Sequence, residues 1–175
     1  PERWTTRQAL LLALFGLAVI PYFVDLGGSS IWDANEAFYV ETPREMLERG
    51  DYIAPTFNYL PRLNKPVLSY WIVGMWYELF GVSVLVQRIP IAFAGVVLIA
   101  VAFVLGRVLS PNYDVAILAG IGLAAGPRLF MFARRIFIDM YVTMFMALTL
   151  MCFALSERYP EKRRGLLIAM YVCIG

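Results

Sequence analysis

Long apolar stretches without charge alternate with short charged segments along most of the chain. A hydrocarbon layer of ~30 Å needs about 20 consecutive apolar residues as a helix, and several stretches approach that length. We expect membrane spans at about residues 8–26, 88–107, 114–132 and 139–156, with an incomplete fifth at 165–175. The third is interrupted at Gly126-Pro127-Arg128, where proline removes a backbone donor and breaks a helix. The pattern predicts an all-α integral membrane protein.

The two ends of the sequence suggest that it belongs to a longer protein. It begins at Pro1 without a methionine and stops at Gly175 inside an apolar run, so we expect an N-terminal portion of a polytopic protein. Arg3 and Arg7 precede the first apolar stretch, and a cleaved secretory signal with residues 27–30 as its cleavage region also fits this start. The length of the stretch and the spans that follow favour a membrane span.

A polar segment separates the first span from the second and predicts an external loop, residues 27–87, with helices of its own. Asp33 has the spacing of an N-cap whose helix carries Glu36 in its first turn. Thr42 is a second candidate N-cap, and Pro43 after it suits the first position of a helix, so we predict a second short helix here. Residues 66–80 are apolar and aromatic but reach only about 22 Å as a helix, which is too short to span comfortably. We expect this third helix to lie at the membrane interface.

Composition supports the membrane assignment and narrows the chemistry. Hydrophobic residues make up 61% of the chain, against about 45–50% in a soluble domain. The net charge of +2 does not indicate a nucleic-acid-binding protein. There is no histidine, so acid–base chemistry must rest on carboxylates. Cys152 and Cys173 lie in apolar runs without a metal-binding motif, and we expect them to be packing residues.

The distribution of charge predicts the orientation in the membrane. Alternate crossings put seven basic and four acidic residues on the side of the N-terminus, and eight basic and nine acidic residues on the side of the long loop. Because positive charge concentrates in cytoplasmic segments, we expect a cytoplasmic N-terminus and a periplasmic loop in a bacterial inner membrane.

Two clusters of polar residues could carry acid–base chemistry. Asp33, Asn35 and Glu36 follow the first span, and helix capping alone explains the aspartate well and the glutamate passably. Arg134 and Asp139 occur where the third span ends and the fourth begins, a depth at which ionisable groups are usually paired or functional. Their spacing is too long for a pair on one helical face, so pairing would need a bend.

A group of cations surrounds the predicted interfacial helix. Arg62, Lys65 and Arg88 could simply anchor it to lipid headgroups, or they could form a cradle for an anionic carrier lipid. Pro66 restricts the backbone of Lys65 and can begin the helix, so the lysine is expected to point in a defined direction.

The order of these motifs resembles the first external loop of the glycosyltransferase family 39-like enzymes, which include aminoarabinose transferases that modify lipid A and protein O-mannosyltransferases. The similarity is continuous over about 60 residues and extends weakly to Arg134 and Asp139. The matching residues are Asp33-Ala34-Asn35-Glu36-Ala37-Phe38-Tyr39, Arg44-Glu45-Met46-Leu47, Gly50-Asp51-Tyr52-Ile53-Ala54-Pro55, Phe57-Asn58, Asn64-Lys65-Pro66, Tyr70-Trp71, Leu79-Phe80-Gly81-Val82, Arg88 and Pro90.

The resemblance implies a GT-C-type helical bundle with juxtamembrane helices in the first external loop. It also implies a polyprenyl-phosphate-linked sugar donor, inversion at the anomeric carbon, and a lipid, glycan or protein acceptor. Lys65 matches the lysine that holds the carrier phosphate, and Arg62, Arg88 and Arg134 are expected to assist it. Asp139 matches a second acid. No cofactor is implied, and a divalent metal is left open.

Asn35 departs from the family pattern, because it occupies the position of the catalytic aspartate while Glu36 matches the glutamate of the same Asp-Glu pair. An amide can orient a nucleophile but cannot take its proton. Asp33 or Glu36 could take over, or the asparagine could be an engineered substitution. The third alternative is a protein that binds or transports polyprenyl-phosphate lipids without catalysis.

Overall fold

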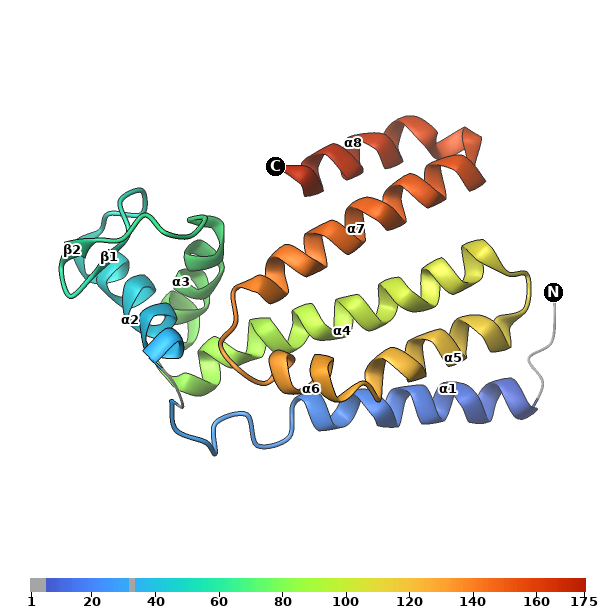
Figure 1. Cartoon of the computed structure of the whole chain (residues 1–175), viewed down its shortest axis with the longest axis horizontal. Coiled ribbons are helices and arrows are strands. Elements are labelled where there is room, and N and C mark those ends of the chain that lie inside the picture. The colour runs from blue at the N-terminus through green and yellow to red at the C-terminus, as the bar shows by residue number, and fades with distance from the viewer. Residues whose placement is uncertain (1–5, 32–33) are drawn as a thin grey trace.

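A computed structural model describes residues 6–31 and 34–175, and the described chain is almost entirely helical (Figure 1). The elements are α1 (Thr6–Val19), η1 (Ile20–Tyr22), α2 (Ala34–Arg49), β1 (Thr56–Phe57), β2 (Leu60–Pro61), α3 (Leu68–Phe80), α4 (Val84–Leu109), α5 (Tyr113–Ala124), α6 (Pro127–Ala133), α7 (Asp139–Arg158), η2 (Pro160–Lys162) and α8 (Arg163–Ile174).

The long helices run side by side along the molecule, and the loop elements gather at one end of them. Helix α4 lies in the middle and packs against α5 and α7, while α1 packs on α5 and α8 on α7 (Figure 1). Helices α2 and α3 and the β1–β2 hairpin lie beyond the ends of α4 and α7. The segment of residues 34–83 is therefore a folded unit that covers one end of the bundle.

Among the described residues, two helices, α4 and α7, are each long and apolar enough to cross a membrane alone. Helices α5 and α6 together make a third span if this pair, which is bent by 60°, crosses as one unit. The α1–η1 segment is apolar but shorter. Helix α4 begins at Val84, inside the segment expected to be loop up to residue 87, because the Ser83 hydroxyl accepts a hydrogen bond from the amide of Val86. The charge of Arg88 does not mark the helix boundary, since this side chain is buried inside the protein.

The break between α5 and α6 lies at the Gly126-Pro127 pair, as its sequence predicts. Pro127 begins α6, where its missing N–H costs nothing. The Tyr22 hydroxyl donates a 2.9 Å hydrogen bond to the carbonyl of Ala124, which the bend removes from the helical ladder. This hydrogen bond from η1 thus stabilises the bend, after which the chain leads through α6 to Asp139.

Small residues let the bundle helices approach closely. A Cβ on Gly106 of α4 would lie 2.7 Å from the Cα of Ala116 on α5. A Cβ on Gly95 would lie 2.7 Å from the Cβ of Ala133 on α6. Close approach through small residues is typical of helices that associate within lipid.

Helix α2 is one continuous helix, so the expected second helix beginning at Thr42-Pro43 is wrong. Proline inside a helix leaves the carbonyl four residues earlier without its partner, here that of Tyr39. The side-chain amide of Gln87 on α4 donates to this carbonyl, and its oxygen accepts from the Tyr77 hydroxyl at 3.0 Å. A long-range contact therefore satisfies the carbonyl that Pro43 frees.

Replacing Gln87 tests this explanation. We expect Gln87→Leu to lower the free energy of unfolding by about 1–3 kcal/mol, because two buried polar groups lose their partner. In a Pro43→Ala background the restored N–H can bond the Tyr39 carbonyl, so Gln87→Leu should cost less there. Denaturant unfolding of the four variants in detergent micelles measures the difference, and equal costs in the two backgrounds would contradict the explanation.

Candidate functional site

Glu36 and Arg88 form a buried junction between the loop and the bundle. Each side chain is 2% exposed, and the Arg88 Nη2 to Glu36 Oε2 distance is 3.8 Å. Glu36 Oε1 also accepts a 3.0 Å hydrogen bond from the amide of Ile136, in the link between α6 and α7. One carboxylate in the first turn of α2 therefore connects α4 with the segment that leads to Asp139.

The two terminal nitrogens of the Arg88 guanidinium also donate to the turn that follows η1, while its buried Nε has no hydrogen-bond partner among the described residues. Nη1 donates to the carbonyl of Leu26 at 2.8 Å and to the carbonyl and hydroxyl of Ser29 at 2.9 and 2.8 Å. Nη2 donates to the carbonyl of Ser30 at 3.2 Å. Arg88 thus holds protein groups, which is a different environment from the lipid-phosphate cradle expected of it.

Lys65 and Asp139 meet at the surface although they are far apart in sequence. Lys65 Nζ lies 3.2 Å from Asp139 Oδ1, at the first residue of α7. The hydrogen bond with Asp139, together with the nearby phenol of Tyr39, raises the pKa of Lys65 above its ordinary value. The side chains are 33% and 68% exposed, and exposed ion pairs contribute only about 0–1 kcal/mol. Lys65 is therefore held charged and oriented by a partner that a stronger anion could displace.

Arg62 lies beside Lys65, at the end of the β1–β2 hairpin. Its guanidinium sits 3.7 Å from the ring centroid of Phe38 on α2, which is a cation–π contact. It also lies close to the Tyr70 hydroxyl of α3, whose pKa is raised by burial and lowered in part by Arg62. One guanidinium group and one ammonium group thus gather where α2, the hairpin and α3 meet α7.

The other expected site residues lie elsewhere or outside the described residues. Asp33 is outside them, and Asn35 lies in the first turn of α2. The Arg134 guanidinium donates to the carbonyl of Pro21 and lies 5.2 Å from the Phe130 ring centroid. A pair between Arg134 and Asp139 would have needed a bend in the chain, and in the structure Asp139 pairs with Lys65 instead.

An apolar groove of about 540 Å³ begins next to the Lys65–Asp139 pair. Pro66 follows the lysine, and Val142 lies one turn beyond Asp139 on α7. From there the groove continues between α7 and α8. Its lining consists of Pro66, Leu68, Val142, Phe145, Met146, Thr149, Leu150, Val172, Cys173, Ile174 and Gly175.

Tyr39 and Tyr70 lie near the cations of the site, and the sequence reasoning gave them no role there. Both belong to the motifs that resemble the family. The spacing of three residues, which puts Tyr39 on the same side of its helix as Glu36, was the signal that could have found it. Both tyrosines lie buried in the core between α2, α3 and α7, below Lys65 and Arg62.

No group of three or more side chains suited to metal binding comes together within residues 6–31 and 34–175. The described part of the chain therefore offers no ready site for the divalent metal that the sequence left open.

Comparison with known proteins identifies the family. The model of the dolichyl-phosphate-mannose-protein mannosyltransferase family matches residues 10–175, nearly the whole chain. The chain belongs to this family. A relative from Pectobacterium atrosepticum, the undecaprenyl phosphate-alpha-4-amino-4-deoxy-L-arabinose arabinosyl transferase, is 29% identical over 92% of the chain. An uncharacterized protein of Aquifex aeolicus is 35% identical over 64% of the chain.

Solved structures support the same assignment. ArnT from Cupriavidus metallidurans in the apo state matches with a TM-score of 0.86, at 25% identity and over 97% of the chain. The same protein bound to undecaprenyl phosphate matches with a TM-score of 0.85 over 94% of the chain. The chain is thus a bacterial membrane protein with the GT-C fold of this mannosyltransferase family.

The chain covers only part of these relatives. It spans 22% of the Aquifex protein, 28% of the Pectobacterium transferase and 32% of the ArnT chain. The described helices therefore correspond to roughly a third or less of each relative.

Truncating Glu36 tests the buried junction. We expect Glu36→Ala to cost about 3–5 kcal/mol of stability, because it leaves the Arg88 cation without its buried counter-charge and the Ile136 amide without an acceptor. Glu36→Gln keeps the acceptor and should cost less. Denaturant unfolding in detergent checks both values. Equal, near-zero costs would show that the junction does not hold the loop on the bundle.

Proposed function

We propose that the chain is the carrier-lipid-binding portion of a membrane glycosyltransferase, which transfers a sugar from a polyprenyl-phosphate-linked donor to a lipid, glycan or protein acceptor. The observation that carries the proposal is the position of Lys65, held against Asp139 at the beginning of an apolar groove. The names of the relatives, which include an undecaprenyl-phosphate-dependent transferase and a structure with bound undecaprenyl phosphate, support it.

A cation at the end of an apolar groove matches the two chemical parts of a polyprenyl phosphate. The groove along α7 offers apolar side chains to an isoprenoid tail, and Lys65 offers an ammonium group to the phosphate. Arg62 adds a second positive charge nearby. The Lys65 ammonium has three donors and its pair with Asp139 is exposed and weak, so a donor phosphate could share this contact or replace it.

The exposed Asp139 carboxylate gives the site an acid–base group. In the proposed reaction an acceptor oxygen attacks the anomeric carbon, the bond from that carbon to the carrier phosphate breaks, and the acceptor proton passes to a base. Lys65 stabilises the negative charge that develops on the departing phosphate. Asp139 is the exposed carboxylate beside it, and Asp33 is the further candidate. Asn35 would orient the acceptor through its amide.

Glu36 and Arg88 take positioning roles in this proposal. Glu36 is buried and already accepts from the Ile136 amide, so it does not face an acceptor at the surface. Arg88 binds the carbonyls of the turn after η1. Their contribution is to fix α2 and the start of α7 relative to each other. Arg134 similarly ties α6 to η1 through the Pro21 carbonyl.

Asn35 favours a second candidate function, a protein that binds or transports the carrier lipid without transferring a sugar. An amide at this position leaves the phosphate-binding part of the site intact and removes one base. The full-length protein separates the two functions, because only the transferase releases polyprenyl phosphate from a labelled sugar donor.

The Lys65→Ala variant of the full-length protein tests the phosphate site. We expect it to weaken binding of undecaprenyl phosphate by about 10-fold or more, since a charge-assisted contact is worth about 1.5–3 kcal/mol. Lys162→Ala is the matched control, because this is the other lysine of the chain and lies in η2 at the opposite end of α7. Equal affinity of wild type and Lys65→Ala in a tryptophan-quenching titration would contradict the assignment.

The raised pKa of Lys65 also predicts the pH dependence of binding. A raised pKa keeps the ammonium charged at neutral pH, so binding of undecaprenyl phosphate should stay constant until the pH passes the ordinary lysine value of about 10.4. Asp139→Asn removes the group that contributes most to the shift, and the loss should then begin at lower pH. An unchanged profile in this variant would mean that Asp139 does not hold the ammonium.

The proposed topology places the N-terminus in the cytoplasm and residues 27–87 in the periplasm of a bacterial inner membrane, which the charge distribution supports. Ile53, between α2 and β1, and Leu109, the last residue of α4, are both 83% exposed. The segment from α2 to β1 lies at the opposite end of the bundle from the α4–α5 connection (Figure 1). With Cys152 and Cys173 replaced by serine, an impermeant maleimide should label Ile53→Cys in intact spheroplasts and Leu109→Cys only after lysis. The reverse pattern would invert the topology.

A further inference from the structure

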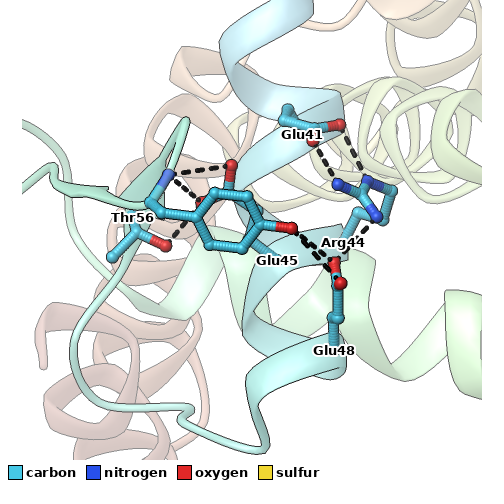
Figure 2. Close-up of polar contacts among 6 residues, drawn as sticks. Glu41, Arg44, Glu45, Glu48 and Thr56 are labelled. Atoms are coloured by element: carbon cyan, nitrogen blue, oxygen red, sulfur yellow. Dashed lines mark hydrogen bonds and ion pairs between the residues drawn. The ribbon is translucent and has the colours of Figure 1, made fainter.

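Glu45 is a buried carboxylate on the middle of α2 that points into the β1–β2 hairpin. Its side chain is fully buried, and Oε2 accepts a 2.5 Å hydrogen bond from the Thr56 hydroxyl. The same oxygen accepts from the backbone amide of Tyr59 at 3.1 Å (Figure 2). Thr56 in turn accepts from Arg49 Nη1 at 3.1 Å, so a cation is linked to the carboxylate through the hydroxyl.

The turn that Glu45 holds is strained in its backbone. Asn58 and Tyr59 connect the two strands with φ values of 52° and 61°, the left-handed region that a two-residue hairpin turn requires. Asparagine tolerates this region, but tyrosine rarely adopts it. The Tyr59 amide is fixed by Glu45, and its hydroxyl lies 3.1 Å from Glu48 Oε2. Helix α2 therefore stabilises a turn in which Tyr59 adopts an unfavourable backbone conformation.

The hairpin continues directly into the cationic side chains of the site. The amide of Arg62 donates to the Pro55 carbonyl at 2.8 Å, which extends the strand pairing by one bond. The guanidinium of Arg62 stacks on Phe38, and Lys65 follows three residues later. A change in the turn would therefore shift both cations relative to α7.

The neighbouring acids of α2 have a different environment. Glu41 and Glu48 are partly exposed and pair with Arg44, whose hydrogen bond lowers the pKa of Glu41 (Figure 2). Such surface pairs contribute little to stability. Glu45 differs from them because it is buried and its partners belong to the hairpin.

We propose that Glu45 is a positioning residue, which orders the β1–β2 hairpin so that Arg62 and Lys65 address the carrier phosphate. This inference rests on the proposed function for the identity of the ligand. Glu45 does not touch the ligand itself, because its carboxylate is enclosed by Thr56 and the backbone of the turn.

The test compares variants of the full-length protein by undecaprenyl phosphate binding and by hydrogen exchange. We expect Glu45→Ala to weaken binding about 5- to 20-fold and to speed exchange in residues 56–65, with exchange in α4 and α7 unchanged. Glu45→Gln should restore binding to within about twofold of wild type, because its amide oxygen can accept from Tyr59 while its NH₂ donates to Thr56. Glu41→Ala is the control that removes the same charge from the same helix, and it should bind like wild type.

Thr56→Val provides a second variant that removes only the hydroxyl and should move binding in the same direction as Glu45→Ala. The proposal is overturned if Glu45→Ala binds as wild type does while Lys65→Ala does not. Equal losses in Glu45→Gln and Glu45→Ala would also overturn it, since charge and not hydrogen bonding would then be responsible. If the wild-type protein itself fails to bind, the proposed function is wrong, and the exchange of residues 56–65 alone decides whether Glu45 orders the hairpin.

Discussion

The buried guanidinium of Arg88 is the interaction on which the arrangement of the loop depends. An isolated cation inside a protein would cost several kcal/mol, and the chain offsets this cost with acceptors from separate segments. The turn after η1 supplies carbonyl and hydroxyl oxygens, and α2 supplies the carboxylate of Glu36. Because α4 carries the arginine, these contacts fix where the turn after η1 lies and where α2 begins.

This junction also determines where the surface chemistry lies. Glu36 binds the amide of Ile136, three residues before Asp139, and it precedes Tyr39 by three residues on α2. The contacts of the Glu36 carboxylate therefore bring the start of α7 close to the phenol of Tyr39. Lys65 approaches that place from the hairpin and pairs with Asp139. A rigid buried contact thus supports a weak exposed pair that a ligand can replace.

The sequence predicted the parts of the fold that depend on local properties. The apolar runs, the helix over residues 66–80 and the break at Gly126-Pro127 follow from composition and backbone chemistry, and the helix and the break are present in the structure. The continuity of α2 through Pro43 could not be predicted, because the compensating donor is Gln87 on another helix. The order of the motifs predicted the mannosyltransferase family, which the comparisons confirm.

For the site, the sequence indicated Lys65 and Asp139 separately, and only the folded chain brings them into contact. Arg88 was expected either to anchor the loop to lipid headgroups or to help bind the carrier phosphate. Its burial depends on acceptors about 60 residues away in sequence, which no local pattern reveals. The role of Glu45 was hidden for the same reason, since its partners lie in the hairpin.

A structure of the full-length protein with bound undecaprenyl phosphate tests the central claim most directly. The phosphate should contact Lys65 Nζ, with the first isoprene units in the groove that begins at Pro66 and Val142. Phosphate density at another position, with the Lys65–Asp139 pair intact, would contradict the assignment of this loop as the carrier-lipid site.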